Sequence, residues 1–321
     1  MRHYLILLLL LFAVFTLHAK QHFATPYSER VYVTQITKAF ADEVNREIGL
    51  NIVFHSGESL YKHNEIYRAL RTNQIQLGEI FIARLSNHAA IYQLDNLPFL
   101  ATNFSSAQQL ANQQAVELRS QFAEHGLHLL FTNPWPPQGL FTSKAIKTAN
   151  DLSGLKVRSY SAMTAKLANH LKMIPTAVSS AEIAQAFATG MIEAMITSPA
   201  TGVSSRAWQF SRYYTPINAW IPKNMVLMNH ALYQSLTPTQ KQKLKQIVNK
   251  YQQRAWQQAE QQTTQMTKLL ADNGMIISPV SDSLSQSLKI VGANMEQEWA
   301  LNATQSELHV LQKFKEQQNA Q

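Results

Sequence analysis

The sequence predicts an α/β protein built in two lobes, and three observations predict this fold class. Short β-like runs alternate with amphipathic helical stretches along the chain, which is the pattern of α/β proteins. After an apolar leader about 300 residues remain, a length at which one hydrophobic core usually splits into two. Finally, no further glycine or proline interrupts the stretch from Pro238 to Asn273. It predicts a helix of roughly 52 Å at 1.5 Å per residue, which we expect to cross both lobes; two shorter helices with a kink are the alternative.

Residues 1–19 have the layout of a secretory signal peptide. A positive start at Met1–His3 precedes the apolar run Tyr4–Leu17, and Ala19 ends the expected cleavage site. The run is too short to span a bilayer comfortably, although an uncleaved N-terminal anchor is the alternative. The chain contains no cysteine, which excludes a lipoprotein anchor. We therefore expect a soluble protein that is exported to the periplasm.

The net charge of the chain and its distribution indicate which kinds of partner the protein can bind. The formal net charge is +8, but the Lys and Arg residues are dispersed and form no basic run. Such a balance favours anionic partners in general. A nucleic-acid-binding protein would concentrate its positive charge in one footprint, so we expect no nucleic-acid partner.

The first half of the chain predicts strands and helices in alternation. Apolar residues recur at spacings of three and four from Val33 to Ile48, and Gly49 follows as a stop signal, which predicts a helix there. The proline-rich stretch Asn133–Pro137 cannot continue a helix or an interior strand, so we expect a loop or crossover. The other elements predicted in this half are a strand at 50–54, a helix at 60–70, and strands at 75–82 and 127–132.

The second half continues the alternation. A turn at Asp151–Gly154 precedes a short strand that ends in Arg158. Ser179 and Glu182 form a capping box for a helix that Gly190 ends. The other elements predicted here are a helix at 162–171, a strand at 191–196 that Thr197–Pro199 closes, and a strand at 224–228.

Signatures of catalysis and of metal binding are weak in this sequence. It contains no GxSxG elbow, P-loop, Rossmann glycine fingerprint or HExxH pair. His125 and His128 are three residues apart but lack a nearby carboxylate, and ligating histidines usually come with further ligands. Glu79 and Glu193 would form an acid/base pair only if the fold brought them together. We therefore expect no catalytic residue, no metal and no cofactor.

Arg158 is the strongest candidate for ligand binding. Ligands of open α/β sheets bind beyond the carboxyl ends of strands, where Arg158 lies in the predicted fold. Its planar guanidinium matches a carboxylate in two parallel hydrogen bonds. An exposed arginine at a strand end is the alternative interpretation. Trp135 and Trp220 lie in proline-flanked loops, where a core role is less natural and contact with an apolar ligand or an interface is expected.

An ordered set of motifs resembles the substrate-binding proteins of tripartite ATP-independent periplasmic (TRAP) transporters, the DctP-like family. Each fragment is short, but together they cover nearly the whole chain after the leader, in order. The segments that carry the resemblance are Ala69–Glu79, Leu97–Leu100, Asp151–Leu152, Gly154–Arg158, Ile174–Pro175, Glu182 and Ala186–Gly190. Those that are similar to one branch of the family are Trp135–Leu140, Ile196–Val203 and Trp220–Asn224.

The resemblance implies a two-lobed periplasmic-binding-protein-like fold with crossing chain segments and a long helix that spans both lobes. We expect lobe I at 20–135 plus 223–264 and lobe II at 136–222 plus 265–321, after the signal peptide at 1–19. The resemblance also implies a ligand buried in the cleft between lobes, which a hinge motion closes. The partners that it implies are a small organic acid and the large and small transmembrane subunits of the transporter, and we expect a monomer.

The resemblance also places Arg158 on the arginine that forms a salt bridge with the ligand carboxylate in this family. The other ligand-binding residues that we expect are Tyr27, Glu79, Phe81, Trp135, Gln138, Thr197, Ser198, Trp220 and Asn224. Two positions depart from the family pattern: Gln138 stands where the sialic-acid branch has a second arginine, and Thr197–Pro199 replaces a common Asn-Pro. We therefore expect a monocarboxylate with a partly apolar body, such as a 2-oxo or aromatic acid. A sensor module that serves a receptor and an exported enzyme are the alternative functions.

Overall fold

The computed structural model describes residues 20–320, so the predicted signal peptide lies outside the described residues. The described chain divides into two compact units. The first contains residues 20–80, 125–131 and 226–251, and the second contains 81–124, 132–225 and 252–320. The chain therefore passes from one unit to the other several times. The lobe boundaries expected from the sequence stay a prediction.

A five-stranded sheet of order β2-β1-β3-β10-β4 underlies the first unit. Strand β1 pairs in parallel with β2 and with β3. The strands are β1 (Gln21–Ala24), β2 (Ile52–His55), β3 (Leu77–Phe81), β4 (Leu127–Pro134) and β10 (Lys223–Asn229). The last residues of β3 and β4 and the first of β10 belong to the second unit, so these strands carry the chain across the division.

The helices of the first unit cover this sheet with an apolar face. They are α2 (Tyr32–Ile48), α3 (His63–Arg71), α8 (His230–Ser235) and the beginning of α9 (Pro238–Asp272). Helix α2 ends at Gly49, whose φ of 77° is the left-handed conformation that glycine adopts without strain. In the core, the Phe40 ring meets Phe131 and Tyr251 at centroid distances of 5.0 and 5.6 Å.

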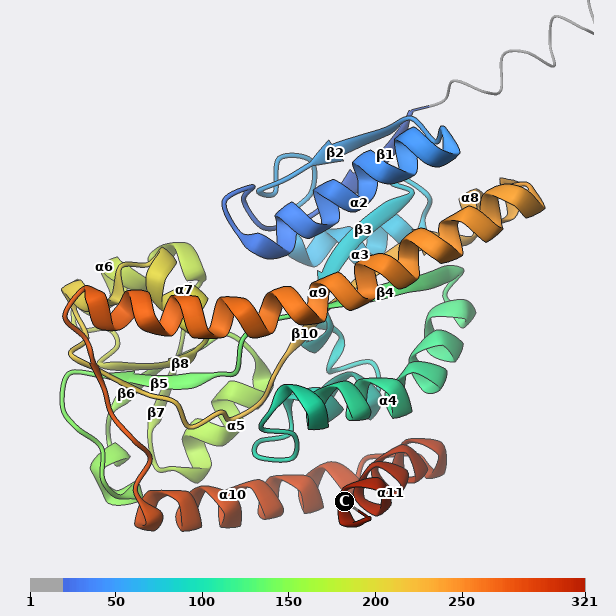
Figure 1. The fold of residues 1–321 in the computed structure, drawn as a ribbon. Coiled ribbons are helices and arrows are strands. Elements are labelled where there is room, and N and C mark those ends of the chain that lie inside the picture. Colours follow the sequence, from blue (N-terminus) through green and yellow to red (C-terminus); the bar gives the residue numbers. More distant parts are fainter. Residues whose placement is uncertain (1–19, 321) are drawn as a thin grey trace, which may run out of the picture. The chain divides into compact units, whose positions relative to one another are not determined.

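The predicted long helix is confirmed as α9, one uninterrupted helix of 35 residues (Figure 1). Thr237 precedes it, and its hydroxyl accepts from the Gln240 backbone N–H at 3.2 Å. The alternative of two kinked helices is wrong, because nothing from Thr239 to Asp272 breaks the hydrogen-bond ladder. The helix contributes residues to both units.

A six-stranded mixed sheet of order β11-β9-β5-β8-β6-β7 underlies the second unit. Strand β6 pairs in parallel with β7 and β8, whereas β5 is antiparallel to β8 and β9. Its core includes Phe141, Met195, Tyr214 and Leu270. The strands are β5 (Gly139–Thr142), β6 (Lys156–Ser159), β7 (Ile174–Ala177), β8 (Ala194–Thr197), β9 (Tyr213–Thr215) and β11 (Ile276–Ile277).

Helices of two kinds complete the second unit. The α-helices are α4 (Phe104–Glu124), α5 (Ala162–His170), α6 (Ile183–Ala188), α7 (Pro199–Ser204), α10 (Asp282–Ala300) and α11 (Gln305–Asn319). The short 3₁₀ helices are η2 (Ile82–Leu85), η3 (Ala90–Asn96), η4 (Ala149–Leu152), η5 (Ser180–Glu182) and η6 (Ala207–Gln209). Helix α11 packs against α4 (Figure 1). The Trp299 indole of α10 donates to the Ala90 carbonyl at 2.8 Å, which ties α10 to η3.

One local expectation is corrected by the fold, and another is confirmed and extended. Strand β4 continues to Pro134, where a loop was expected; β4 lies at the edge of its sheet, where proline is tolerated. Thr197–Pro199 does more than close a strand, because Ser198 is the N-cap of α7 and Pro199 its first residue. Among residues 20–320, no helix has both the length and the hydropathy needed to cross a membrane.

Candidate functional site

Arg158 is a buried cation in the second unit. It is the third residue of β6, a strand with neighbours on both sides, and its side chain is 4% exposed. The Nε group donates to the Val178 carbonyl oxygen at 3.0 Å, which fixes the plane of the guanidinium. Burial lowers the pKa of Arg158 to about 10, so the side chain remains positively charged at neutral pH.

No aspartate or glutamate among residues 20–320 forms an ion pair with Arg158. The other buried cation in this part of the chain, Lys223, does have such a partner: its ammonium lies 2.9 Å from the Asp95 carboxylate. A buried charge without a counter-ion is costly. Among residues 20–320, Arg158 is therefore a buried cation without a carboxylate counter-ion.

Tyr160 is the centre of the hydrogen bonds beside Arg158. Its hydroxyl donates to Gln138 Oε1 at 2.9 Å and accepts from the Trp220 indole at 3.2 Å. Its ring lies 5.2 Å from the Arg158 guanidinium carbon, a cation–π distance. Burial raises the pKa of Tyr160 to about 12, so the phenol stays neutral. The sequence prediction missed Tyr160, although its place two residues after Arg158 puts both on one side of an extended chain.

Both polar atoms of the Gln138 side-chain amide form hydrogen bonds. Besides accepting from Tyr160, it donates through Nε2 to the Pro136 carbonyl at 2.9 Å. Its backbone N–H donates to the Trp220 carbonyl at 3.0 Å. Gln138 therefore orients Tyr160 and lies 3% exposed.

Trp220 is fully buried, with 0% of its surface exposed. The expectation that a tryptophan in a proline-flanked loop lies outside the core is wrong for this residue. The local sequence could not reveal the reason, which is a backbone pairing with Gln138 that brings Trp220 inside. Its indole N–H is satisfied by Tyr160, as burial of this side chain requires.

Trp135 and Asn224 lie together. The Trp135 indole donates to Asn224 Oδ1 at 3.1 Å, and Asn224 is fully buried. The preceding residue, Lys223, also donates to Gln114 Oε1 at 2.7 Å. Burial lowers the pKa of Lys223, and Asp95 opposes the shift. No local pattern predicts this ion pair, because its two members are 128 positions apart.

Phe81, Thr197 and Ser198 also lie in the second unit. The Phe81 ring meets the Tyr160 ring edge-on at 6.1 Å and is an apolar neighbour of the arginine site. Thr197 and Ser198 are buried at the end of β8. The Ser198 hydroxyl accepts from the Thr201 backbone N–H at 3.1 Å, so its first role is to cap α7.

The remaining predicted residues, Tyr27 and Glu79, lie in the first unit. Glu79 is fully buried and accepts from the Thr25 hydroxyl at 2.6 Å. Burial, and then the charge of Glu79, raise the pKa of Tyr32 well above its ordinary value. The Tyr27 ring packs edge-on against His63 at 5.7 Å.

Residues considered for metal binding or acid/base chemistry have other contacts. His125 shares a hydrogen bond with the Tyr67 hydroxyl at 2.6 Å, and His128 shares one with His230 at 2.8 Å. Glu193 is exposed and accepts from the Lys156 backbone N–H at 3.1 Å. Within residues 20–320, no three His, Asp or Glu side chains converge as metal ligands would.

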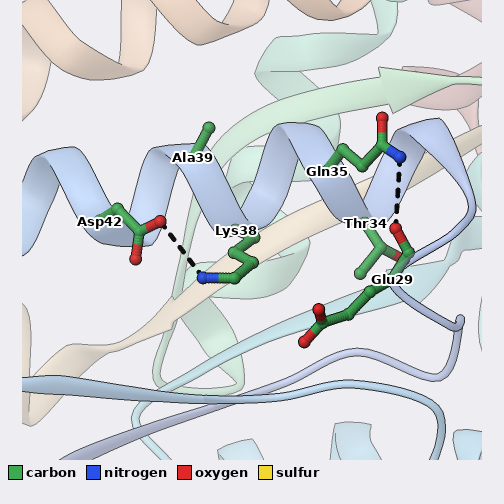
Figure 2. A pocket seen from close by; sticks show the side chains of 6 residues that line it. All are labelled: Glu29, Thr34, Gln35, Lys38, Ala39 and Asp42. Atoms are coloured by element: carbon green, nitrogen blue, oxygen red, sulfur yellow. Dashed lines mark hydrogen bonds and ion pairs between the residues drawn. The ribbon is translucent and has the colours of Figure 1, made fainter.

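A hollow along α2 in the first unit contains none of the predicted site residues (Figure 2). Lys38 and Asp42, one turn apart on α2, pair at 3.3 Å, and Gln35 donates to the Glu29 carbonyl at 3.3 Å. The hollow therefore contains one ion pair and the further carboxylate of Glu29, whereas the arginine site contains a cation without a carboxylate partner among residues 20–320.

Comparison with known proteins identifies the family. The model of the bacterial extracellular solute-binding proteins, family 7 (DctP), matches residues 23–300. No curated protein sequence matches the chain significantly. The family model and the solved structures described below are those of solute-binding proteins, so the protein is a binding protein and not an enzyme.

Three of these structures share about a third of their residues with the chain. DctP7 of Bordetella pertussis, an extracytoplasmic solute receptor binding pyroglutamic acid, is 33% identical, with a TM-score of 0.89 over 93% of this chain and 100% of that one. DctP6 of the same organism, also binding pyroglutamic acid, is 34% identical, with the same TM-score and coverage. A TRAP solute-binding protein from a marine metagenome, specific for pyroglutamate, is 31% identical, with a TM-score of 0.87 over 93% of this chain and 99% of that one. The chain therefore belongs to the family 7 extracellular solute-binding proteins, the DctP-like substrate-binding proteins of TRAP transporters.

Proposed function

We propose that this protein captures a small monocarboxylic acid outside the cytoplasm and delivers it to the membrane subunits of a TRAP transporter. The observation that carries the proposal is Arg158, a buried cation without a carboxylate partner among residues 20–320. A ligand carboxylate would supply the missing charge. Because Nε already donates to Val178, the two Nη groups remain as a fork for two parallel hydrogen bonds.

Pyroglutamate is the first candidate ligand. The three similar structures described above hold or are specific for this acid. It combines one carboxylate with a compact lactam ring, and the Arg158 cation lies beside the aromatic side chains of Tyr160 and Phe81. A carboxylate with a partly apolar body fits this combination of charge and aromatic surface.

The charge of the site favours a ligand with one carboxylate. Gln138 is neutral, and its side-chain amide already forms hydrogen bonds with the Tyr160 hydroxyl and the Pro136 carbonyl. Lys223 is paired with Asp95. Arg158 therefore remains the uncompensated cation of this cluster, and a second carboxylate on the ligand would be desolvated without a partner.

A thermal-shift panel on unfolded and refolded protein tests the proposal. Refolding removes any ligand carried through purification. Ligand at about 100 times its dissociation constant adds roughly 2.7 kcal/mol of stability, which raises the melting temperature by several degrees. The panel contains pyroglutamate, 2-oxo acids, aromatic acids and dicarboxylates. We expect the largest shift with pyroglutamate and none with Arg158→Ala; a folded protein that responds to no acid contradicts the proposal.

Delivery is tested separately from binding. Vesicles that contain the transporter subunits should accumulate the acid when the wild-type protein is added, and not when Arg158→Ala is added. A protein that binds the acid with high affinity but supports no uptake with its own membrane subunits would instead serve a receptor.

A further inference from the structure

Histidines form two close pairs in the first unit, and the function proposed above uses neither of them. His22 of β1 and His55 of β2 share a hydrogen bond between Nδ1 and Nε2 at 2.9 Å. His128 of β4 and His230 of α8 share a second one, between Nε2 and Nδ1, at 2.8 Å. The fold therefore builds the same arrangement twice, from residues that are 33 and 102 positions apart.

The two pairs lie at opposite edges of the five-stranded sheet. Its order, β2-β1-β3-β10-β4, puts β2 at one edge and β4 at the other. In the register of β1 and β2, Ala24 lies opposite His55, so His22 and His55 share one face of the two strands. His230 is the first residue of α8, and its bond to His128 ties this helix to β4. Loss of the two bonds would therefore loosen β2 at one edge and α8 at the other.

A hydrogen bond between two imidazoles requires that one of the facing nitrogens carry no proton. Neutral imidazole has one N–H donor and one acceptor, whereas both nitrogens of the imidazolium ion donate. Each pair therefore keeps its bond while it holds at most one added proton. When both rings are protonated, two N–H groups face each other and two positive charges repel at close range.

No carboxylate compensates a second charge on the first pair. Among residues 20–320, neither His22 nor His55 forms an ion pair with an aspartate or glutamate. The polar groups that bind these strands from neighbouring elements are neutral. The Gln76 side-chain oxygen accepts from the His22 backbone N–H at 2.9 Å, and the Asn45 amide of α2 binds the Ile52 backbone. Burial, and then the charge on His22, lower the pKa of His55.

The second pair has a cation as its charged neighbour. The Tyr233 ring of α8 lies against the His128 ring with centroids 4.0 Å apart, and Lys241 Nζ of α9 lies 5.2 Å from the Tyr233 ring centre. Burial, and then the charges on His230 and Lys241, lower the pKa of His128. In the part of the chain that the structure describes, no carboxylate forms an ion pair with either histidine.

We propose that these two histidine pairs form a pH-sensitive switch in the first unit. With at most one added proton each, they hold β2 and α8 in place; with both rings protonated, they release them. The pKa of His55 and of His128 is lower in the folded chain than the value of about 6.5 in an unfolded one. The stability that the pairs confer is therefore complete above about pH 6.5 and is lost as the pH falls through the folded-state pKa values. This switch does not depend on the acid binding proposed for Arg158.

Glutamine in place of one histidine of each pair tests the switch. Its amide donates and accepts as a neutral imidazole does but takes up no proton. His55→Gln and His128→Gln should therefore retain the stability that urea unfolding measures at pH 8. From pH 6.5 to pH 5, each wild-type pair should raise the unfolding constant by up to about tenfold per pH unit, and each substitution should remove the contribution of its own pair.

The control variant lies in the second unit. His309→Gln, at an exposed position of α11, should leave the pH dependence of unfolding unchanged. A chelator is present throughout, so that no metal ion bridges the paired rings. Wild-type pH dependence in His55→Gln or in His128→Gln would overturn the proposal for that pair.

Hydrogen exchange of the wild-type chain tests where the structure loosens, and it needs no variant. After correction for the intrinsic effect of pH on exchange, the protection of β2 and α8 should fall roughly tenfold from pH 7 to pH 5.5. The protection of β6, in the second unit, should stay constant. Unchanged protection of β2 and α8, or an equal loss in β6, would overturn the proposal.

Discussion

At the scale of single residues, the arginine site depends on groups that the ligand need not touch. Tyr160 joins Gln138 and Trp220 through one hydroxyl and lies against Arg158 with its ring. Each of these residues is buried or nearly so. The position of the guanidinium therefore rests on a polar network that is satisfied within the second unit.

Tyr160→Phe tests this network. Without the hydroxyl, Gln138 and Trp220 each lose a partner while the ring remains. Because an unpaired buried polar group costs about 1–3 kcal/mol, we expect the free energy of unfolding in urea to fall by that amount and the acid affinity to fall about tenfold. Unchanged stability and affinity would show that the network does not position Arg158.

The pH dependence of acid binding follows from two groups. The ligand carboxyl is ionised above about pH 4. The pKa of Arg158 is lowered to about 10 by burial, so free protein loses this positive charge as the pH rises through that value. We expect acid affinity measured by calorimetry to be constant from pH 6 to 8 and to fall near pH 10. Constant affinity up to pH 11 would mean that Arg158 keeps its charge despite burial, or that another cation binds the carboxylate.

Residue-level prediction from the sequence succeeded where a local pattern was sufficient. The run before Arg158 and the turn at Asp151–Gly154 identified the strand that carries the arginine. Tyr160 and the Lys223–Asp95 pair were missed, since their importance depends on partners far along the chain. Trp220 was predicted to lie outside the core and is fully buried, again because its partner Gln138 is far away along the chain.

At the scale of elements, strand β5 shows how one residue permits close packing. A Cβ atom on Gly139 would lie 2.3 Å from the Tyr214 ring of β9, and the two strands are neighbours in the sheet. Because glycine has no side chain, the Tyr214 ring can pack directly against the backbone of β5 at Gly139, the residue before Leu140.

Gly139→Ala should destabilise the protein. Overpacking of a buried site costs about 1–3 kcal/mol, which urea unfolding would measure as a lower midpoint at an unchanged slope. In a Tyr214→Ala background the same substitution should cost much less, because the clashing ring is gone. An equal loss in both backgrounds would contradict the steric explanation.

Elements were predicted best where strong signals bounded them. Helix α9 followed from an absence of breakers after Pro238, and α2 from its apolar spacing and Gly49. Strand β4 was predicted too short, because a proline cluster was interpreted as a loop, and its edge position is set by strands elsewhere in the chain.

At the scale of the whole molecule, the family and the two-part organisation were predictable from the sequence, and the predicted lobe boundaries stay a prediction. The length of the chain and the alternation of predicted strands and helices indicated two lobes. The ordered set of motifs indicated the family, which the match of the family model over residues 23–300 confirms. The division falls within β3, β4, β10 and α9. Such crossings arise from long-range strand pairing and leave no local mark in the sequence.

Export of the molecule is tested by its mature N-terminus. We expect protein recovered from the periplasm of a producing cell to begin at Lys20, because the predicted signal peptide ends at Ala19. Intact-mass measurement would detect this, and Ala19→Pro, which blocks the cleavage site, is the matched control. A mature protein that retains residues 1–19 would support the N-terminal anchor instead.

The central claim is that Arg158 binds the carboxylate of a small acid, and calorimetric titration of refolded protein with pyroglutamate tests it most directly. Arg212→Ala is the matched control, since Arg212 is exposed and lies 5.8 Å from the Tyr213 ring in the same unit. We expect Arg158→Ala to weaken binding by about 2–5 kcal/mol and Arg212→Ala to leave it unchanged. Wild-type affinity in folded Arg158→Ala would contradict the claim.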